Sequence, residues 1–307
     1  MTPAAPAPKQ PYHRFSHEAM TTGFDALIIH PDVQYARSAA YAVFAEVDRM
    51  ERLLNRHEPG TDISQINALR PGQWMRVTLE VLECLEIAAR AFIETGGAFD
   101  VAFRSTAGGT RPSAMNFLLL SRPESDTDEP MEHLVGIDPQ AADHGFDGAE
   151  IDLGGVGKGY ALDQARAIMR DWELDNYLLH SGTSTVLASG AGPAGEGWPV
   201  GVSGDYRDET GIRTTQLRDC SMSGSGTAVK GDHIRNPHTG EAATALCAWA
   251  LHPSAAWTDC LTTALMIMTQ AQAREFCQQH TDISAIALYP AAPGATPEVK
   301  ILVHGPW

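Results

Sequence analysis

The segment IDLGGVGKGYA, residues 151–161, combines an acidic residue, a lysine and four glycines within six positions. It does not fit the phosphate-binding P-loop, because Gly159 stands where that loop has a serine or threonine for Mg²⁺, and its glycine spacing differs from the dinucleotide fingerprint. Glycines before a helix, with Lys158 beside its first turn, still favour an anion through free N–H groups and the helix dipole. A tight strand-to-helix turn with a surface lysine would have the same sequence, so the loop alone leaves both interpretations open.

A carboxylate and a hydroxyl, Asp259 and Thr263, lie four residues apart in AAWTDCLTTALMIM. On a helix this spacing places both side chains on one face, about 5–6 Å apart at Cβ. Hard oxygen ligands of this kind suit Mg²⁺ or Ca²⁺. Such a pair also occurs as capping or back-bonded groups, but the neighbours Leu261 and Leu265 are apolar, and a buried carboxylate needs a partner. We therefore predict a metal site that includes Asp259 and Thr263.

Two further segments carry groups that could act in catalysis. TGGAFD presents Asp100 after two glycines, and GDHIRNPHTG presents His233 and His238 around an Asn-Pro turn. The two histidines do not have the spacing of a zinc site. Taken singly, each histidine is more typical of a turn than of a catalytic centre.

The elements that position these residues follow from hydrophobic periodicity. Apolar residues spaced by three and four predict one helix after the capping residue Asp32, a short helix after Thr61, and another from Thr78 to the glycines at 96–97. Strands occur in runs with a few long helices among them, which indicates an α+β fold with mixed or antiparallel sheets. The remaining expected elements are strands at 24–29, 177–180, 185–189, 198–203, 244–251 and 283–289, a strand ending at Leu153, a helix over 158–172 and a last helix over 255–277.

Composition limits the classes of partner. The chain has 307 residues and a formal net charge of −16, without a cluster of Lys and Arg, so nucleic-acid binding is excluded. Its five cysteines are scattered and form no metal-ligand spacing, which favours reduced core residues. Residues 1–13 are rich in Pro and Ala and predict a disordered arm, followed by a catalytic domain over 14–307 that is single or divided into two intertwined subdomains. We see no signal peptide, lipobox or membrane anchor, so we expect a cytoplasmic location.

Taken in order, six segments resemble motifs of the ApbE family, the FAD:protein FMN transferases. They are HEAMTTGFDALI, TDISQIN, GGAFD, DLGGVGKGYALD, HIRNPHTG and TDCLTTAL. The resemblance implies an ApbE-like fold and Mg²⁺-dependent transfer of FMN from FAD to a Thr or Ser hydroxyl of a target flavoprotein, with release of AMP.

The resemblance also implies roles for individual residues. Asp259 and Thr263 match the metal-binding side chains, and the carbonyls of Gly155 and Thr262 match the backbone metal ligands. His233 is the candidate base, with Asp232 or Asp100 as alternatives. The positions that match the FAD contacts are Met20, His57, Ala98, Phe99, Asp100, Asp152, Lys158 and Ile234.

Three departures from the family pattern keep other functions open. Asn236 replaces the usual aspartate in HIRNP, SGTST replaces a Gly-Gly-Asp/Asn stretch, and MTTG replaces Met-Gly-Thr; His57 also stands where many members have tyrosine. An asparagine cannot act as a carboxylate base. The alternatives are a Mg²⁺-dependent FAD pyrophosphatase that yields FMN and AMP, and an FAD-binding protein with weakened catalysis.

Overall fold

An eight-stranded sheet organises the molecule, with strands in the order β1-β2-β6-β7-β10-β11-β12-β13. The computed structural model describes residues 10–102, 113–121, 133–146, 148–202, 214–227, 234–291 and 299–307. Every neighbouring pair in this sheet is antiparallel, which confirms the predicted α+β class. Its strands are β1 (His13–Ala19), β2 (Thr22–Ile28), β6 (Tyr177–Ser181), β7 (Thr185–Ser189), β10 (Cys220–Gly226), β11 (Cys247–His252), β12 (Ser284–Pro290) and β13 (Val299–His304).

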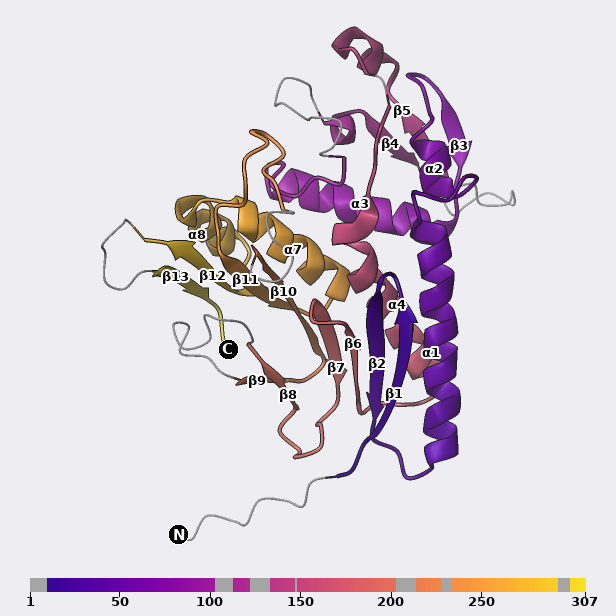
Figure 1. Ribbon diagram of the computed structural model, residues 1–307, viewed down its shortest axis with the longest axis vertical. Coiled ribbons are helices and arrows are strands. Elements are labelled where there is room, and N and C mark those ends of the chain that lie inside the picture. The colour runs from indigo at the N-terminus through magenta and orange to yellow at the C-terminus, as the bar shows by residue number, and fades with distance from the viewer. Residues whose placement is uncertain are drawn as a thin grey trace.

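Two smaller sheets flank the large one, at the upper right and the lower left of Figure 1. One has the order β3-β5-β4, and the other pairs β8 with β9. Their strands are β3 (Trp74–Arg76), β4 (Leu118–Ser121), β5 (Leu134–Ile137), β8 (Trp198–Gly201) and β9 (Thr214–Leu217). The helices are α1 (Val33–Leu54), α2 (Asp62–Ile66), α3 (Leu79–Glu94), α4 (Gly157–Asp171), α7 (Ala255–Ile267) and α8 (Gln270–Gln279), with 3-10 turns η2 (Ala114–Asn116), η3 (Pro139–His144) and η4 (Leu153–Gly155).

The helix α1 forms as the sequence predicts. Asp32 caps it by accepting hydrogen bonds from the amides of Gln34 and Tyr35. Its buried residues recur every three or four positions and pack with residues of α4 against one face of β2 and β6. Because successive strand residues point to opposite faces, Phe24 and Ala26 of β2 face these helices.

The helix α7 lies in the centre of the protein. All of its residues are buried except Thr263, which is partly exposed. It packs with residues of α3, α8, β11 and β12 in the largest hydrophobic cluster. A helix that is apolar on all sides belongs inside a core, so any polar group that α7 carries requires a specific partner.

Three sequence expectations differ from the structure. The predicted helix over 255–277 is two helices, because Met268 is extended and Thr269 starts α8 with a reciprocal capping box to Gln272. The expected strand ending at Leu153 is absent from the described residues there; Asp152 instead caps the 3-10 turn η4. The strands β1, β3, β4, β5, β9, β10 and β13 were not predicted. In β1, for example, His13–Ala19 is polar at five of its seven positions, so the alternation that indicates a strand is missing, and it forms an edge strand.

The described residues also bear on the expectations for the N-terminal arm, the cysteines and membrane-spanning helices. Residues 1–9 of the expected arm lie outside them, whereas the Gln10 amide donates to the Pro193 carbonyl (2.7 Å) and His13 begins β1. None of the five cysteines forms a disulfide, and Cys220 alone among them is not fully buried. Within the described part of the chain, no helix is long and apolar enough to cross a membrane.

Candidate functional site

The glycine loop and the carboxylate of Asp259 come together where α4 crosses α7. The amide of Gly159, in the first turn of α4, donates to Asp259 Oδ2 (3.3 Å) over a separation of 100 residues. Lys158 Nζ lies 3.9 Å from the same oxygen. Asp259 is buried, with a relative exposure of 4%. Its partners therefore include the positive N-terminal end of a helix and an ammonium group, which stabilise a buried carboxylate.

Glycine at position 159 allows this crossing. A Cβ on Gly159 would lie 2.2 Å from the Ala255 carbonyl oxygen and 2.8 Å from Ala256 Cα, both backbone atoms of α7. These separations are shorter than ordinary carbon contacts. Gly159 thus brings the backbones of the two helices into contact.

Thr263 faces the same place from α7. Its Oγ1 donates to the carbonyl of Asp259 (3.2 Å), so the lone pairs of the hydroxyl oxygen remain available. A Cβ built on Gly155 would lie 3.8 Å from this oxygen and 3.2 Å from Phe99 Cε2, which places Gly155 beside Thr263. Thr262 is oriented differently: its hydroxyl donates to the Asp259 carbonyl (3.2 Å) and accepts from Ser225 of β10 (3.0 Å).

The donor atoms fit a hard cation. Asp259 supplies a carboxylate and Thr263 a hydroxyl, and Gly155 lies beside Thr263. Such oxygen ligands suit Mg²⁺. The described residues contain no group of three or more His, Cys, Asp or Glu side chains that could hold a metal ion. A metal at this point would thus depend on hydroxyl and carbonyl oxygens as well as the carboxylate.

The loop before α4 is held by its own side chains. Asp152 Oδ1 accepts from the amide of Gly154 (3.0 Å), and Lys158 Nζ donates to the Gly154 carbonyl (2.7 Å). Arg56 Nε lies 3.1 Å from Asp152 Oδ2 in an ion pair without hydrogen-bond geometry. Sequence reasoning did not identify Arg56, which follows the end of α1 and adds a second cation near the loop.

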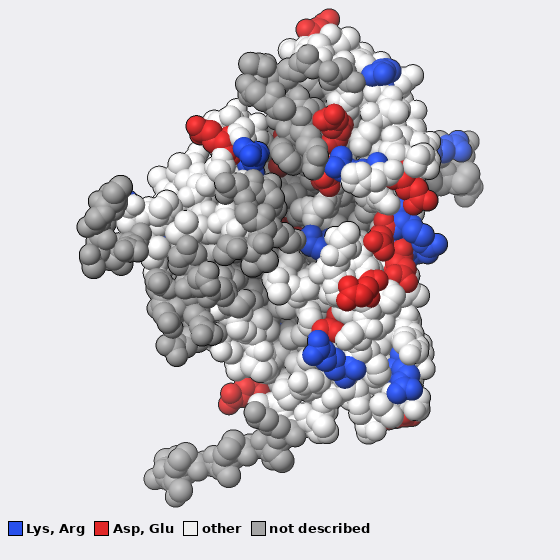
Figure 2. Space-filling model, in the orientation of Figure 1, with Lys and Arg blue, Asp and Glu red and all other residues white. Residues whose placement is uncertain are grey.

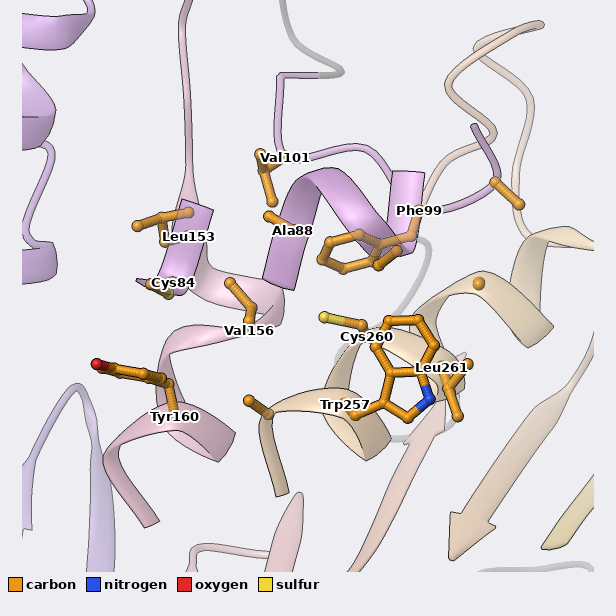
Figure 3. Packing of buried hydrophobic residues seen from close by; sticks show 14 of the residues in the cluster. Cys84, Ala88, Phe99, Val101, Leu153, Val156, Tyr160, Trp257, Cys260 and Leu261 are labelled. Atoms are coloured by element: carbon orange, nitrogen blue, oxygen red, sulfur yellow. The ribbon is translucent and has the colours of Figure 1, made fainter. Parts of the chain in front are cut away.

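The turn after α3 carries the predicted residues Phe99 and Asp100. Thr95 Oγ1 accepts from the amide of Phe99 (3.0 Å), and Asp100 accepts from the amide of Ala102 (2.7 Å). Burial raises the pKa of the Asp100 carboxyl above its ordinary value, and the hydrogen bond from Ala102 acts in the opposite direction. Figure 3 shows Phe99 above the side chains of α7, near Trp257.

The four predicted apolar contacts lie in or against one hydrophobic cluster. Ala98, Phe99 and Ile234 are buried members of it, and Met20 packs against it from the β1–β2 turn. Met20 has a φ of 49° and donates its amide to Glu51 Oε1 (2.8 Å). A positive φ is uncommon for a residue with a side chain and is typical of the tight turn between two antiparallel strands.

One predicted residue is not joined to this cluster, and two others lie outside the described residues. His57 is exposed, and its amide donates to Asn55 Oδ1 (2.8 Å). His233 and Asp232 lie outside the described residues. The described residues therefore give no position for the predicted catalytic histidine.

Asn236 has a structural role in its own turn. Its Oδ1 accepts from the amides of His238 (2.8 Å) and Thr239 (3.3 Å). An aspartate oxygen would accept the same bonds, so the exchange of Asp for Asn preserves the turn. His238 Nε2 donates to the Gly96 carbonyl (3.1 Å) and connects this turn to the turn before Phe99.

The surface around the site is not basic. Figure 2 shows a hollow near the middle of the face that is turned to the viewer, with separate basic and acidic side chains around it. The absence of a basic patch on the described part of this face agrees with the net charge of −16.

Comparison with known proteins identifies the family. The ApbE family matches residues 20–287. The flavin transferase ApbE of Vibrio cholerae has 17% identity and a TM-score of 0.73, with 96% of this chain and 98% of that chain covered. The flavinyl transferase ApbE of Pseudomonas stutzeri, in its apo form, has 16% identity and a TM-score of 0.74, with 96% of each chain covered. The ApbE protein of Thermotoga maritima has 22% identity and a TM-score of 0.73, with 95% and 97% covered.

At these identities the structural likeness concerns the fold. A search of curated proteins gave no match. The family match, however, spans most of the sequence and includes the glycine loop, α4 and α7. The chain belongs to the ApbE family.

Proposed function

We propose that the protein transfers the FMN part of FAD to a threonine or serine hydroxyl of a target protein, in a Mg²⁺-dependent reaction that releases AMP. The observation that carries this proposal is the meeting of Lys158 and Gly159 of α4 with Asp259 of α7. A pyrophosphate and a divalent cation together need both positive groups and hard oxygen ligands. Membership of the ApbE family, and the names of the Vibrio and Pseudomonas transferases, support the same reaction.

In this proposal the chain's residues bind the pyrophosphate and the flavin ring of FAD. Lys158 and the N-terminal end of α4 attract the pyrophosphate. Met20, Phe99 and Ile234 belong to or pack against one apolar cluster and offer a surface for the flavin ring. Asp152 and Ala98, which border these groups, are further FAD contacts, and His57 is a weaker candidate because it is exposed.

The metal would be held by Asp259 and Thr263, with the carbonyls of Gly155 and Thr262. When bound, Mg²⁺ supplies positive charge that offsets the charge that develops as the phosphorus–oxygen bond to AMP breaks.

The acceptor hydroxyl forms the new bond to phosphorus and loses its proton to a base. His233 is the first candidate for this base, and Asp100 is the second. Burial raises the pKa of Asp100 toward the range in which a carboxylate accepts a proton more readily. Water in place of the hydroxyl would give FMN and AMP, which is the pyrophosphatase reaction.

One experiment separates these reactions. Purified protein is incubated with FAD, Mg²⁺ and a target that carries the family's Asp-Gly-x-Ser/Thr-x-x-Thr motif, and both target mass and AMP are followed. A target mass increase equal to FMN supports the transferase. AMP without this increase indicates an FAD pyrophosphatase. The absence of both products refutes both reactions.

A matched pair of variants tests the metal site in the same assay. Thr263→Val removes the hydroxyl and keeps the side-chain shape, whereas Thr263→Ser keeps the hydroxyl. We expect the first to lose Mg²⁺-dependent turnover and the second to retain it. Equal activity of the two variants would contradict a metal role for Thr263.

A further inference from the structure

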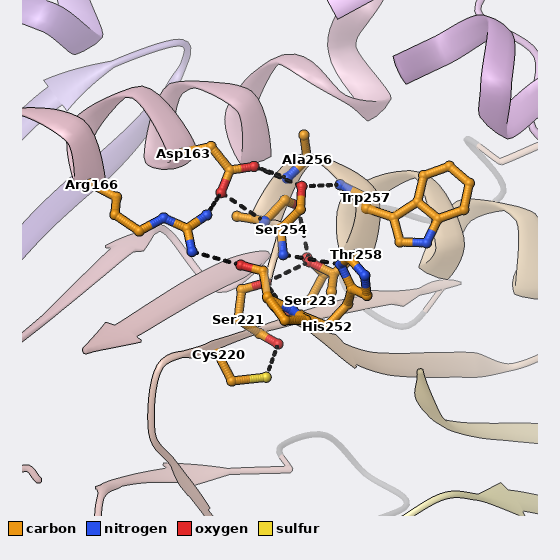
Figure 4. Close-up of polar contacts among 12 residues, drawn as sticks. Asp163, Arg166, Cys220, Ser221, Ser223, His252, Ser254, Ala256, Trp257 and Thr258 are labelled. Carbon is orange, nitrogen blue, oxygen red and sulfur yellow. Dashed lines mark hydrogen bonds and ion pairs between the residues drawn. The ribbon is translucent and has the colours of Figure 1, made fainter. Parts of the chain in front are cut away.

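Asp163 lies on α4, one helical turn after Gly159, and contacts the start of α7 (Figure 4). Its carboxylate accepts hydrogen bonds from the amides of Ala255 (3.0 Å) and Ala256 (2.9 Å) and from the Ser254 hydroxyl (2.8 Å). The first N–H groups of a helix have no partner within the helix, so a carboxylate that binds them stabilises the helix end. The helix α4 therefore supplies the cap of α7.

Neighbouring side chains extend this connection. The Ser254 hydroxyl also accepts from the amide of Trp257 (3.2 Å), so the first amides of α7 are held by Asp163 and Ser254 together. Arg166, one turn further along α4, donates to Asp163 and to the Pro253 carbonyl (2.9 Å). The chain is thus bound to α4 on both sides of the residue where α7 begins.

The same relation occurs in the opposite direction at the site. Asp259 of α7 accepts from the amide of Gly159, in the first turn of α4 (3.3 Å). Gly159 and Asp163 are one turn apart on α4, and Ala255 and Asp259 are one turn apart on α7. Each helix provides a carboxylate to the N-terminal turn of the other, and the two contacts fix how the helices cross.

We infer that Asp163 is a positioning residue for the cation site. It holds the first turn of α7, and this rigid turn carries Asp259 to the glycine loop, with Thr263 one turn beyond. The inference rests on the proposed function, in which α7 supplies the metal side chains. Partners that orient metal ligands typically change metal affinity by about 10- to 100-fold when they are removed. Asp163 does not bond the side chain of a proposed metal ligand directly; it acts through the backbone of α7, which carries these ligands.

Direct Mn²⁺ binding to the full chain, measured by electron paramagnetic resonance without FAD, tests this role. We expect Asp163→Asn to raise the Mn²⁺ dissociation constant by about tenfold. Asp32→Ala is the control, because it removes another helix cap that serves two amides, at the start of α1. The far end of α1 also reaches the loop, because Leu54 lies beside Gly157. The control therefore removes a cap from another helix that contacts the site. We expect the control to lower the thermal midpoint and to leave the dissociation constant within about twofold.

The outcomes are distinct. A lower thermal midpoint of Asp163→Asn with unchanged Mn²⁺ affinity would mean a purely structural cap and would overturn the inference. If Asp163→Asn does not fold, Arg166→Ala removes the link to Pro253 and must weaken Mn²⁺ binding in the same direction; an unchanged affinity overturns the inference. Wild-type protein that binds no Mn²⁺ also overturns it. Wild-type protein that binds Mn²⁺ but transfers no FMN refutes the proposed function alone.

Discussion

Replacement of Gly159 by alanine tests whether the contact between α4 and α7 fixes the site. The new Cβ would lie 2.2 Å from the Ala255 carbonyl oxygen, whereas carbon atoms ordinarily pack at about 3.5–4.0 Å. Because the opposing atoms are backbone, the helices must separate by roughly 1 Å. Overpacking costs about 1–3 kcal/mol, and the better helix propensity of alanine offsets about 1 kcal/mol. We expect a net loss of about 0–2 kcal/mol in the free energy of unfolding.

The same change should reduce activity more than stability. Separation of the helices moves the Gly159 amide away from Asp259 Oδ2, now 3.3 Å distant, and a misplacement of about 1 Å can cost about 100-fold in rate. The assays are thermal denaturation and FMN transfer at saturating FAD and Mg²⁺. Gly157→Ala is the stability control, because its Cβ would meet only the flexible end of Leu54, at 3.2 Å. Wild-type stability and rate in Gly159→Ala would refute the reasoning.

Four further predictions concern single side chains. Asp259→Asn should lower Mg²⁺-dependent turnover by about 10²- to 10³-fold with the fold retained by circular dichroism; unchanged turnover contradicts the metal assignment. Lys158→Met should raise the KM for FAD by about 10- to 100-fold, and an unchanged KM excludes its pyrophosphate role. Asn236→Asp should change unfolding free energy by less than about 0.5 kcal/mol and leave the transfer rate unaltered; a large gain in rate would mean that a carboxylate acts there. Asp100 has a raised pKa, so the stability its protonation contributes is present below the unfolded pKa and is lost as pH rises through the folded pKa. The thermal midpoint of Asp100→Asn relative to wild type should therefore be higher at about pH 8 than at about pH 4, and no such difference contradicts the shift.

Local sequence signals predicted the elements that depend on local physics. The start of α1 follows from the side chain of Asp32, and the start of α2 follows from Thr61. The strands β2, β6, β7 and β12 coincide closely with apolar runs. The break before α8 also had a local signal, the Thr269–Gln272 capping box, but the continuous apolar pattern of the preceding residues obscured it. Such patterns identify an element more reliably than its ends.

The arrangement of the site required long-range contacts that no local pattern contains. The family resemblance named Asp259 and the glycine loop separately, but only the fold brings the Gly159 amide to the Asp259 carboxylate. Asp163 illustrates the same limit. In the sequence it is one more acidic residue on a helix, and its importance follows from amides 92 and 93 residues away.

The position of α7 explains why chemistry and stability are closely connected in this protein. A helix buried on nearly all sides offers little space for polar groups, so Asp259 must be matched by the positive end of another helix. That requirement brings α4 close, and the close contact requires glycine at position 159. Thr263, beside Gly155 of the loop, is the one residue of α7 with partial exposure. We thus expect substitutions of Gly159 or Asp163 to act on the helix crossing first and on turnover through it, and changes at Thr263 to reach the proposed cation site without disturbing the core.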